Sequence, residues 1–306
     1  MELNEAVDDL RTIQDLVRWG VSEFRRAEIF FGHGTDNAID EALALVVHGL
    51  ALPHGLPAEL LATRTTRSER QRVVDLFARR VNERIPAAYL IGEAWFAGLP
   101  FYVDSRVIVP RSPIAELIEK QFAPWTDGEQ VEHVLDLCTG SGCIAIACAL
   151  AFPAAHVDAV ELSAGAFEVA QRNVARHHVE EHVTLLQGDL FAPIPNGRRY
   201  DVIVSNPPYV GREEMALLPA EYGHEPAMAL AAGEDGLSVV TRILREARHY
   251  LQPDGILVVE VGNAEVALVE RFSKVPFTWL EFSRGGGGVF LLTAAELEQH
   301  VKEFRD

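Results

Sequence analysis

From about Pro113 onward, short apolar runs alternate with segments of helical periodicity. The strand-like runs of this half cover 131–137, 156–161, 183–187, 201–205 and 255–261. The helical patterns between them cover 144–150, 164–177 and 236–250. Strands and helices that alternate in this way predict an α/β fold, a parallel sheet with helices on both faces. A glycine run at 285–288, between apolar segments at 278–282 and 289–292, predicts a terminal antiparallel hairpin.

The first 86 residues follow a different pattern. Apolar positions recur there at helical spacing, and Thr35-Asp36 and Ser68-Glu69-Arg70-Gln71 are typical of helix starts. Short strand-like runs at 94–96 and 101–103 flank a tight turn. We therefore expect a helical bundle at 1–86, a β-hairpin connector at 87–112 and the α/β domain at 113–306.

Composition limits the class of protein. Hydrophobic residues make up 48% of the 306 residues, and no apolar run reaches the ~18 residues of a membrane span. The three cysteines, at 138, 143 and 148, form no Cys-x-x-Cys pair, so we expect reduced thiols, no metal and no membrane in a cytoplasmic protein.

Charge is unevenly distributed along the chain. The net charge of −18 disfavours a protein that binds nucleic acid over its whole surface and suits a basic protein partner. The segment 64–84 is the exception, with seven arginines against three acids. This segment is either a solvated helix face or a local contact with RNA or another acidic surface.

A glycine-containing turn with polar neighbours ends the first predicted strand. It reads Asp136-Leu137-Cys138-Thr139-Gly140-Ser141-Gly142-Cys143. Glycines at such a turn let a ligand approach the backbone closely. Glu161 ends the next strand, where a carboxylate can accept from both ribose hydroxyls, and Asp189 follows the third, where it can accept from an adenine amino group beside Leu190. Three acids at successive carboxyl ends predict a site for a nucleoside-containing cofactor.

The tetrapeptide Asn206-Pro207-Pro208-Tyr209 directly follows the fourth strand. Its prolines have no N–H and fix φ, so the turn is stiff and its carbonyls are free to accept. The Asn206 side chain is a further acceptor. A planar amino group, on an amide or a nucleobase, presents two donors that these acceptors can bind. For the tetrapeptide alone, a rigid loop that only ends a strand is the alternative.

A dehydrogenase is the rival interpretation of the glycine turn. The run Gly140-Ser141-Gly142-Cys143-Ile144-Ala145 satisfies the dinucleotide pattern GxGxxA, with Glu161 ~20 residues further on. A hydride-transfer site has no need of Asn-Pro-Pro-Tyr, however. Asp136, Asp189 and the terminal hairpin also favour a methyltransferase.

Together these motifs resemble the HemK-type protein glutamine methyltransferases, a family of class I S-adenosylmethionine-dependent enzymes with a Rossmann-like sheet. The resemblance covers nearly the whole chain and includes the segments 84–90, 225–230 and 233–237. It implies S-adenosylmethionine as cofactor and a glutamine side chain as methyl acceptor. The implied cofactor-binding residues are Asp136, Thr139, Gly140, Ser141, Gly142, Cys143, Glu161, Asp189, Leu190 and Asn206.

The same resemblance implies roles in the proline turn. The Asn206 side chain and the Pro207 carbonyl would accept the two amide hydrogens and so serve as catalytic groups. Pro208 and Tyr209 would complete the substrate-binding surface, with Tyr209 packed beside the glutamine.

The loop at 110–118 distinguishes two branches of that family. The release-factor branch usually reads Pro-Arg-Pro-Asp-Thr-Glu, whereas this chain reads Pro-Arg-Ser-Pro-Ile-Ala-Glu-Leu-Ile. This loop, with Trp95-Phe96 and the segment 101–104, resembles the branch that methylates a glutamine of large-subunit ribosomal protein three. We therefore expect that protein as partner, alone or in an assembling ribosomal particle.

Three alternatives remain: a release-factor methyltransferase, an N6-adenine nucleic-acid methyltransferase, and a non-enzymatic binding protein with the same fold.

Overall fold

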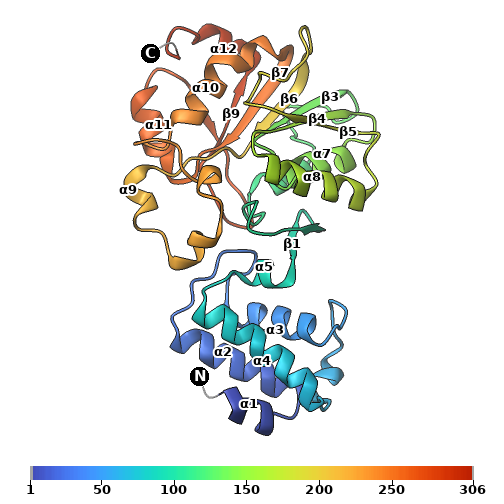
Figure 1. Ribbon diagram of the computed structural model, residues 1–306. Helices are drawn as coiled ribbons and strands as arrows, with labels where there is room; N and C mark the ends of the chain where they lie inside the picture. Colours follow the sequence, from blue (N-terminus) through green and yellow to red (C-terminus); the bar gives the residue numbers. More distant parts are fainter. Residues whose placement is uncertain (1–2, 305–306) are drawn as a thin grey trace. The chain divides into compact units, whose positions relative to one another are not determined.

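The computed structural model describes residues 3–304 and divides the chain into two compact units (Figure 1). The first unit comprises the residues up to Ala94 together with Pro219–His224. The second comprises Trp95–Leu218 and the chain from Glu225 onward. The three-part division at 86 and 112 stays a prediction. The sequence pattern did not indicate that 219–224 would join the first unit.

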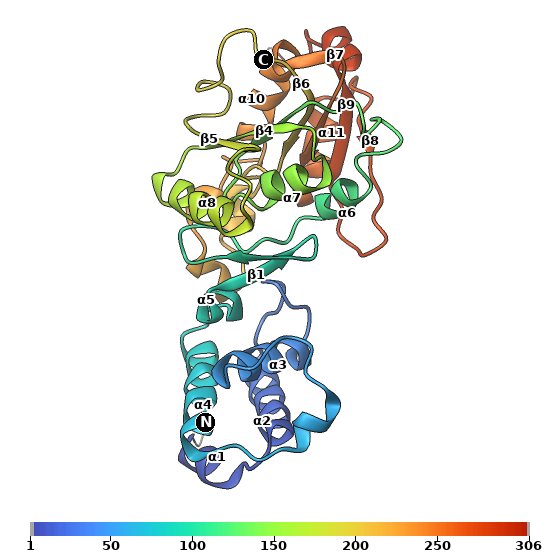
Figure 2. The same ribbon diagram turned by 90° about the vertical axis from the view of Figure 1, so that its right-hand side faces the viewer.

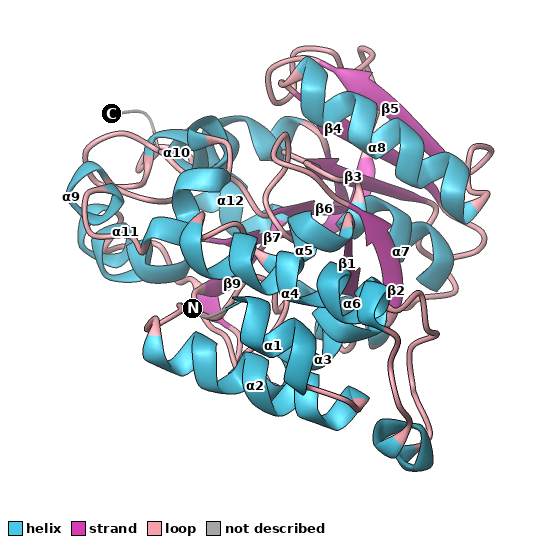
Figure 3. Cartoon of the chain, turned by 60° about the horizontal axis from the view of Figure 1, so that its bottom comes forward, coloured by secondary structure: helices cyan, strands magenta, loops and turns pink. Residues whose placement is uncertain are grey.

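The first unit is helical, as predicted (Figures 2 and 3). Its helices are α1 (Leu3–Asp9), α2 (Ile13–Arg26), α3 (Ala38–Gly49), η1 (Ala58–Ala62), α4 (Arg67–Asn82), α5 (Ala87–Ile91) and the short η2 (Ala220–His224). Phe24 and Phe77 pack edge to face in the core, with 5.3 Å between their ring centroids. Gly20 allows helix α2 to approach Phe77 closely, since a Cβ at that position would lie 2.5 Å from the ring.

Both helix starts that we predicted in this unit lie two residues from the observed caps. Helix α4 begins after Thr66, which forms a capping box with Glu69. The Thr66 N–H donates to the Glu69 carboxylate at 2.7 Å. A charged carboxylate is a stronger acceptor than the neutral side chain of Gln71, which would have filled this position in the predicted box, and this favours the start at Thr66. Helix α3 begins after Asn37, whose side chain accepts from two backbone N–H groups.

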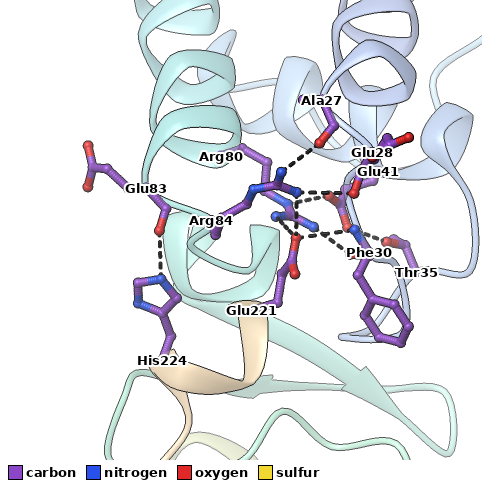
Figure 4. A network of polar contacts seen from close by, with 10 residues as sticks. All are labelled: Ala27, Glu28, Phe30, Thr35, Glu41, Arg80, Glu83, Arg84, Glu221 and His224. Atoms are coloured by element: carbon purple, nitrogen blue, oxygen red, sulfur yellow. Dashed lines mark hydrogen bonds and ion pairs between the residues drawn. The ribbon is translucent and has the colours of Figure 1, made fainter. Parts of the chain in front are cut away.

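A buried ion-pair network joins residues 219–224 to the rest of the first unit (Figure 4). Arg80 is fully buried and donates to Glu41 at 2.6 Å, to Glu221 at 3.1 Å and to the Phe30 carbonyl at 2.7 Å. Arg84 also lies 3.4 Å from the Glu221 carboxylate. We call Arg80, Arg84, Glu41 and Glu221 the Arg80 network. Burial alone would raise the pKa of Glu221, but hydrogen bonds from the backbone and from Arg80 bring it below its usual value.

Two further contacts fix the same segment. The Tyr222 ring packs against Phe30 and His33, with centroid distances of 5.8 and 4.6 Å. His224 donates to the Glu83 carbonyl at 2.7 Å. Ring packing and a hydrogen bond therefore attach residues 219–224 to the helical unit, in addition to the ion pairs of Glu221.

The arginine-rich segment is less solvated than its composition indicates. Arg70 is buried and donates to the carbonyls of Val7 and Thr65, each at 2.6 Å. Arg80 is buried in its network. Four of the seven arginines lie at exposed positions: Arg64, Arg67, Arg72 and Arg79. Two of the seven arginines, Arg70 and Arg80, thus make their contacts inside the unit rather than with solvent.

The second unit contains a seven-stranded sheet with the order β5-β4-β3-β6-β7-β9-β8. The strands are β3 (His133–Leu137), β4 (His156–Glu161), β5 (Val183–Gln187), β6 (Tyr200–Ser205), β7 (Leu251–Glu260), β8 (Thr278–Trp279) and β9 (Val289–Thr293). Neighbours from β5 to β7 pair in parallel, and β9 is antiparallel to both of its neighbours. The predicted α/β class and its terminal antiparallel hairpin are confirmed. The separate β1 (Glu93–Phe96) and β2 (Leu99–Tyr102) form the predicted two-stranded hairpin.

Helices cover both faces of the sheet (Figure 1). They are α6 (Ile114–Glu119), α7 (Cys143–Ala151) and α8 (Ala164–His177) on one face, and α10 (Ser238–Glu246), α11 (Glu265–Arg271) and α12 (Ala294–Gln299) on the other. Successive strand residues alternate between the two cores: Val134 packs under α7, whereas Leu135 faces α10. Shorter helices are α9 (Arg212–Met215), η3 (Ala227–Ala229), η4 (Ala247–His249) and η5 (Gly262–Ala264).

Strand β7 begins four residues before the predicted strand. Its pairing with β6 is irregular, because Tyr200 pairs with Leu251 and Val202 with Ile256. Pro253 lies in this irregular stretch, before the predicted start at Gly255, and hid the first residues of the strand from the apolar pattern.

Candidate active site

A cavity of about 220 Å³ lies in the second unit, at the carboxyl ends of strands β3 to β6. Segments after four parallel strands contribute to its lining, as does a wall formed by residues 226–231. Six of the predicted site residues line it: Gly140, Glu161, Asp189, Leu190, Asn206 and Pro208. Seven others do not: Asp136, Thr139, Ser141, Gly142, Cys143, Pro207 and Tyr209.

The two glycines of the β3 turn have different surroundings. Gly140 has φ +57°, and a Cβ there would meet nothing within 4 Å, so its backbone faces open space. Gly142 has φ +80°, and a Cβ there would lie 3.4 Å from the Ala170 side chain of α8. Gly140 therefore leaves room for a ligand, whereas Gly142 allows the turn to approach a helix.

Glu161 connects the ends of β3 and β4. Its Oε2 accepts from the Gly140 N–H and its Oε1 from the Ser163 N–H, each at 2.8 Å. Burial raises the pKa of Glu161, although these two backbone hydrogen bonds oppose the shift. Glu161 lines the cavity, and a carboxylate oxygen that accepts one hydrogen bond can accept another, which suits a ribose hydroxyl.

Asp136 lies in the interior rather than at the cavity surface. Its Oδ2 accepts from the Ala145 N–H of α7 at 3.1 Å and from the Thr139 hydroxyl. Gly142, the residue before α7, has no side chain that could cap the helix, so Asp136 supplies the cap from β3. Burial raises the pKa of Asp136 to about 7. Its Oδ1 makes no hydrogen bond with any residue in the range 3–304.

Asp189 and Leu190 follow β5. The Asp189 side chain is half exposed, and its carboxylate lies 2.8 Å from the Arg242 guanidinium of α10. Leu190 has a φ of +47° and is buried. Arg242 was not predicted, because a single arginine in a helix carries no sequence signal.

The residues 206–209, which we call the acceptor turn, follow β6. Ser205 donates to the Leu137 carbonyl at 2.7 Å and fixes the end of the strand. Asn206 lines the cavity, and among the described residues no partner hydrogen-bonds its side chain. Its amide is therefore available to a ligand.

Tyr209 lies beside the cavity and binds the sheet. Its hydroxyl donates to Glu260 Oε1 at 3.0 Å. Its ring lies against Gly262, where a Cβ would come within 2.6 Å of Tyr209 Cε2. The acceptor turn is thus fixed at its last residue by contacts that the sequence pattern did not predict.

An ion pair connects the 110–118 loop to the cavity wall. The Arg111 guanidinium donates to both oxygens of Glu225, each at 2.6 Å, and the Val109 N–H donates to Glu225 at 3.0 Å. Glu225 precedes the wall residue Pro226. The sequence pattern singled out the segment 225–230, but it did not predict that Glu225 would pair with Arg111.

Asn173 of α8 is another residue that sequence reasoning missed. Its Nδ2 donates to the carbonyls of Ser141 and Tyr102, at 2.8 and 3.0 Å, and its Oδ1 accepts from the Tyr102 N–H. One buried side chain therefore connects α8, β2 and the glycine turn. An asparagine within a helical pattern gives no signal for such a role.

Comparisons with known proteins place this geometry in a family. Residues 120–220 match the model of the methyltransferase small domain. The catalytic domain of hMettl16, solved in complex with a 3'UTR hairpin, has a similar fold with a TM-score of 0.50 and 17% identity, covering 74% of this chain and 80% of that one.

Two curated relatives are much more similar. The ribosomal protein uL3 glutamine methyltransferase of Xanthomonas campestris is 52% identical over 96% of this chain and 95% of its own length. The protein of the same description from Bordetella pertussis is 52% identical over 96% of this chain and 99% of its own length. The chain belongs to the family of ribosomal protein uL3 glutamine methyltransferases.

Proposed function

We propose that this protein transfers a methyl group from S-adenosylmethionine to the side-chain amide nitrogen of a glutamine in large-subunit ribosomal protein three, uL3. The observation that carries the proposal is Asn206, whose side chain lines the same cavity as Gly140, Glu161 and Asp189 and has no hydrogen-bond partner among residues 3–304. The descriptions of the two relatives support the choice of substrate.

The lining fits the cofactor chemically. The open side of Gly140 leaves room beside the backbone, Glu161 suits the ribose hydroxyls, and Asp189 with Leu190 suits the adenine. The cofactor-binding side of the cavity would also depend on the shape of the turn after β3, which is set by Asp136, Thr139, Ser141, Gly142 and Cys143. When bound, the cofactor supplies an electrophilic methyl group on a sulfonium.

A primary amide is a poor nucleophile because its nitrogen lone pair is delocalised, as the ~18–20 kcal/mol rotation barrier of the peptide bond shows. The Asn206 side chain and the Pro207 carbonyl would accept the two amide hydrogens, which increases negative charge on the nitrogen. Each such bond contributes about 1.5–3 kcal/mol, so orientation of the amide is the larger contribution of these residues. Pro208 and Tyr209 would complete the acceptor surface.

The test is incubation with labelled S-adenosylmethionine and large-subunit proteins from cells that lack this methylation, followed by mass spectrometry. A single added methyl group on a uL3 glutamine is the expected result. Label on a peptide chain release factor, or on the N6 position of adenine in DNA or RNA, would replace the proposed substrate with one of the alternatives. Absence of turnover on all of them would contradict the enzymatic assignment.

We further propose that the enzyme acts in the cytoplasm and contacts RNA in an assembling particle through the exposed arginines of 64–84. The exposed charge at Arg64, Arg67 and Arg79 supports this contact. Arg70 and Arg80 are excluded from it because both are buried. No helix within residues 3–304 is long and apolar enough to cross a membrane.

A further inference from the structure

A buried carboxylate at the end of β7 binds hydroxyl groups from two distant segments. Glu260 Oε1 accepts from the Tyr209 hydroxyl at 3.0 Å, and Glu260 Oε2 accepts from the Ser112 hydroxyl. Glu260 is only 5% exposed. A carboxylate in such a position is costly unless its hydrogen bonds compensate for lost hydration, and both of its oxygens are indeed bonded.

Tyr209 is fixed at three points. Its hydroxyl binds Glu260, its ring lies against Gly262, and its carbonyl passes so close to Gly236 that a Cβ there would lie 2.3 Å from the oxygen. Glycine at 236 and 262 is therefore needed for Tyr209 to occupy this position. A residue held by ring, carbonyl and hydroxyl has little freedom to reorient.

The position of Tyr209 is transmitted to the cavity wall. The next residue, Val210, donates its N–H to the Leu230 carbonyl at 2.8 Å and accepts from the Ala232 N–H at 2.9 Å. Ala229 and Ala231 line the cavity. Movement of Tyr209 would therefore displace both the acceptor turn and the facing wall.

Ser112 fixes the other side of Glu260. Its hydroxyl donates to Glu260 and accepts from the Ile114 N–H at 3.2 Å. The preceding residue, Arg111, binds Glu225 beside the wall. The 110–118 loop thus binds two carboxylates. Glu260 holds Tyr209 of the acceptor turn, and Glu225 directly precedes the cavity residue Pro226.

We propose that Glu260 is a positioning residue for methyl transfer. It holds Tyr209 through its hydroxyl and so orients the acceptor turn in which Asn206 lies, while Ser112 holds Glu260. This inference rests on the proposed function, because the acceptor turn is assigned there to the methyl-accepting amide. Glu260 does not line the cavity, so it acts through Tyr209 rather than on the substrate.

The experiment is a double-mutant cycle in the full-length enzyme with Tyr209→Phe, Glu260→Ala and the double variant. We expect each single variant to lower kcat about tenfold, the rate equivalent of ~1.4 kcal/mol, with the affinity for S-adenosylmethionine unchanged. The double variant should lie within about twofold of either single variant, because both remove the same bond. Glu260→Gln retains an acceptor for the Tyr209 hydroxyl and should recover kcat to within about threefold of wild type.

The chain offers a matched control. Tyr200, at the start of β6, is buried and donates its hydroxyl to the Asp158 carboxylate at 2.7 Å. Tyr200→Phe removes a hydroxyl–carboxylate bond of the same kind but should leave kcat of the folded enzyme unchanged. An equal loss of kcat in Tyr200→Phe, wild-type kcat in Tyr209→Phe, or multiplied losses in the double variant would each overturn the proposal.

The cycle also separates this inference from the proposed function. If wild-type enzyme methylates another acceptor instead of uL3 glutamine, the substrate assignment fails, and the same variants are measured on that acceptor. Shared loss in Tyr209→Phe and Glu260→Ala there still supports the positioning role. Independent losses there contradict it.

Discussion

Arg80 of α4 and Glu221, which follows it by 141 positions in the chain, form an ion pair within the first unit, with 3.1 Å between Nη1 and Oε1. Both side chains are almost fully buried, and Glu41 shares the same guanidinium. Removal of one member of a buried charge pair leaves the other without compensation, which typically costs about 3–5 kcal/mol.

Arg80→Ala is therefore expected to lower the free energy of unfolding by about 3 kcal/mol or more, because Glu41 and Glu221 lose their shared partner. Urea titration followed by circular dichroism measures the change. Arg79→Ala is the matched control: its side chain is exposed and lies 3.9 Å from Glu83, so its loss should cost under ~1 kcal/mol. Equal effects of the two substitutions would contradict the structural role of Arg80.

Asn206→Ala should lower methyl transfer by about 100-fold or more, as is typical when a group that binds the reacting centre is removed. Binding of S-adenosylmethionine should weaken much less, because Gly140, Glu161 and Asp189 are unchanged. Calorimetric titration and a turnover assay give the two numbers. Asn196→Ala, in an exposed turn, should alter neither, and near-wild-type turnover of Asn206→Ala would exclude the assigned role.

Glu161→Gln is expected to weaken cofactor binding about ten- to hundredfold. The NH2 group of the glutamine would face the N–H of either Gly140 or Ser163, so two donors would meet there. A buried donor left without an acceptor costs about 1–3 kcal/mol. Asp189→Asn should have a smaller effect, because that side chain is half exposed and paired with Arg242. Calorimetric titration measures the cofactor affinity of both variants. A larger loss of affinity in Asp189→Asn than in Glu161→Gln would contradict the assigned role of Glu161.

Glu260 makes a specific prediction about stability and pH. Burial raises its pKa to about 7, while hydrogen bonds from Ser112 and Tyr209 limit the shift. Because the folded pKa lies above the unfolded value of 4.5, the folded state keeps a proton that the unfolded state has released. The free energy of unfolding contributed by this group therefore falls as pH rises from 4.5 to 7, by at most about 3 kcal/mol at ~1.4 kcal/mol per pKa unit.

Glu260→Gln should reduce the loss of stability between pH 5 and pH 8, as measured by urea titration at both values. Glu116 is a control of opposite sign, since hydrogen bonds from Ser283 and Arg284 hold its pKa at about 2. Its contribution is present above pH 4.5 and is lost only as the pH falls toward 2. Glu116→Gln should thus change stability equally at pH 5 and pH 8, and a Glu260→Gln profile parallel to wild type would contradict the raised pKa.

Charge reversal at Arg64 and Arg79 tests the RNA contact. The double variant should methylate isolated uL3 at the wild-type rate but assembling particles more slowly, and the difference should shrink as salt rises. Arg25→Glu, at an exposed position of α2 outside the segment, should affect both substrates equally. Equal losses on both substrates in the Arg64 and Arg79 variant would remove RNA contact from the proposal.

Local signals predicted much of the sheet domain. Strands β4 and β5 and helix α8 have the predicted bounds, because apolar runs and helical periodicity are short-range features. The start of β7 was missed because Pro253 interrupts its apolar pattern. The strand-end pattern also selected Glu161 and Asn206, and both side chains line the cavity; their roles in binding and catalysis stay predictions.

Long-range polar contacts could not be predicted. The sequence gives no reason to pair Ser112 with Glu260, which lie 148 positions apart, or Arg80 with Glu221. Charged residues are usually solvated, so composition indicated an exposed arginine face where Arg70 and Arg80 are buried. Asp136 was predicted from its place before the glycine turn, but its role as a helix cap depends on the fold around it.

The contribution of residues 219–224 to the first unit has a consequence for engineering. The chain passes between the two units at three junctions, after Ala94, Leu218 and His224. Deletion of residues 1–94 would therefore leave behind six residues, among them Glu221 and Tyr222, that have lost the surfaces on which they pack. Neither part can be excised by a single cut, so chimaeras with related enzymes should exchange the 219–224 strap together with the bundle that it completes.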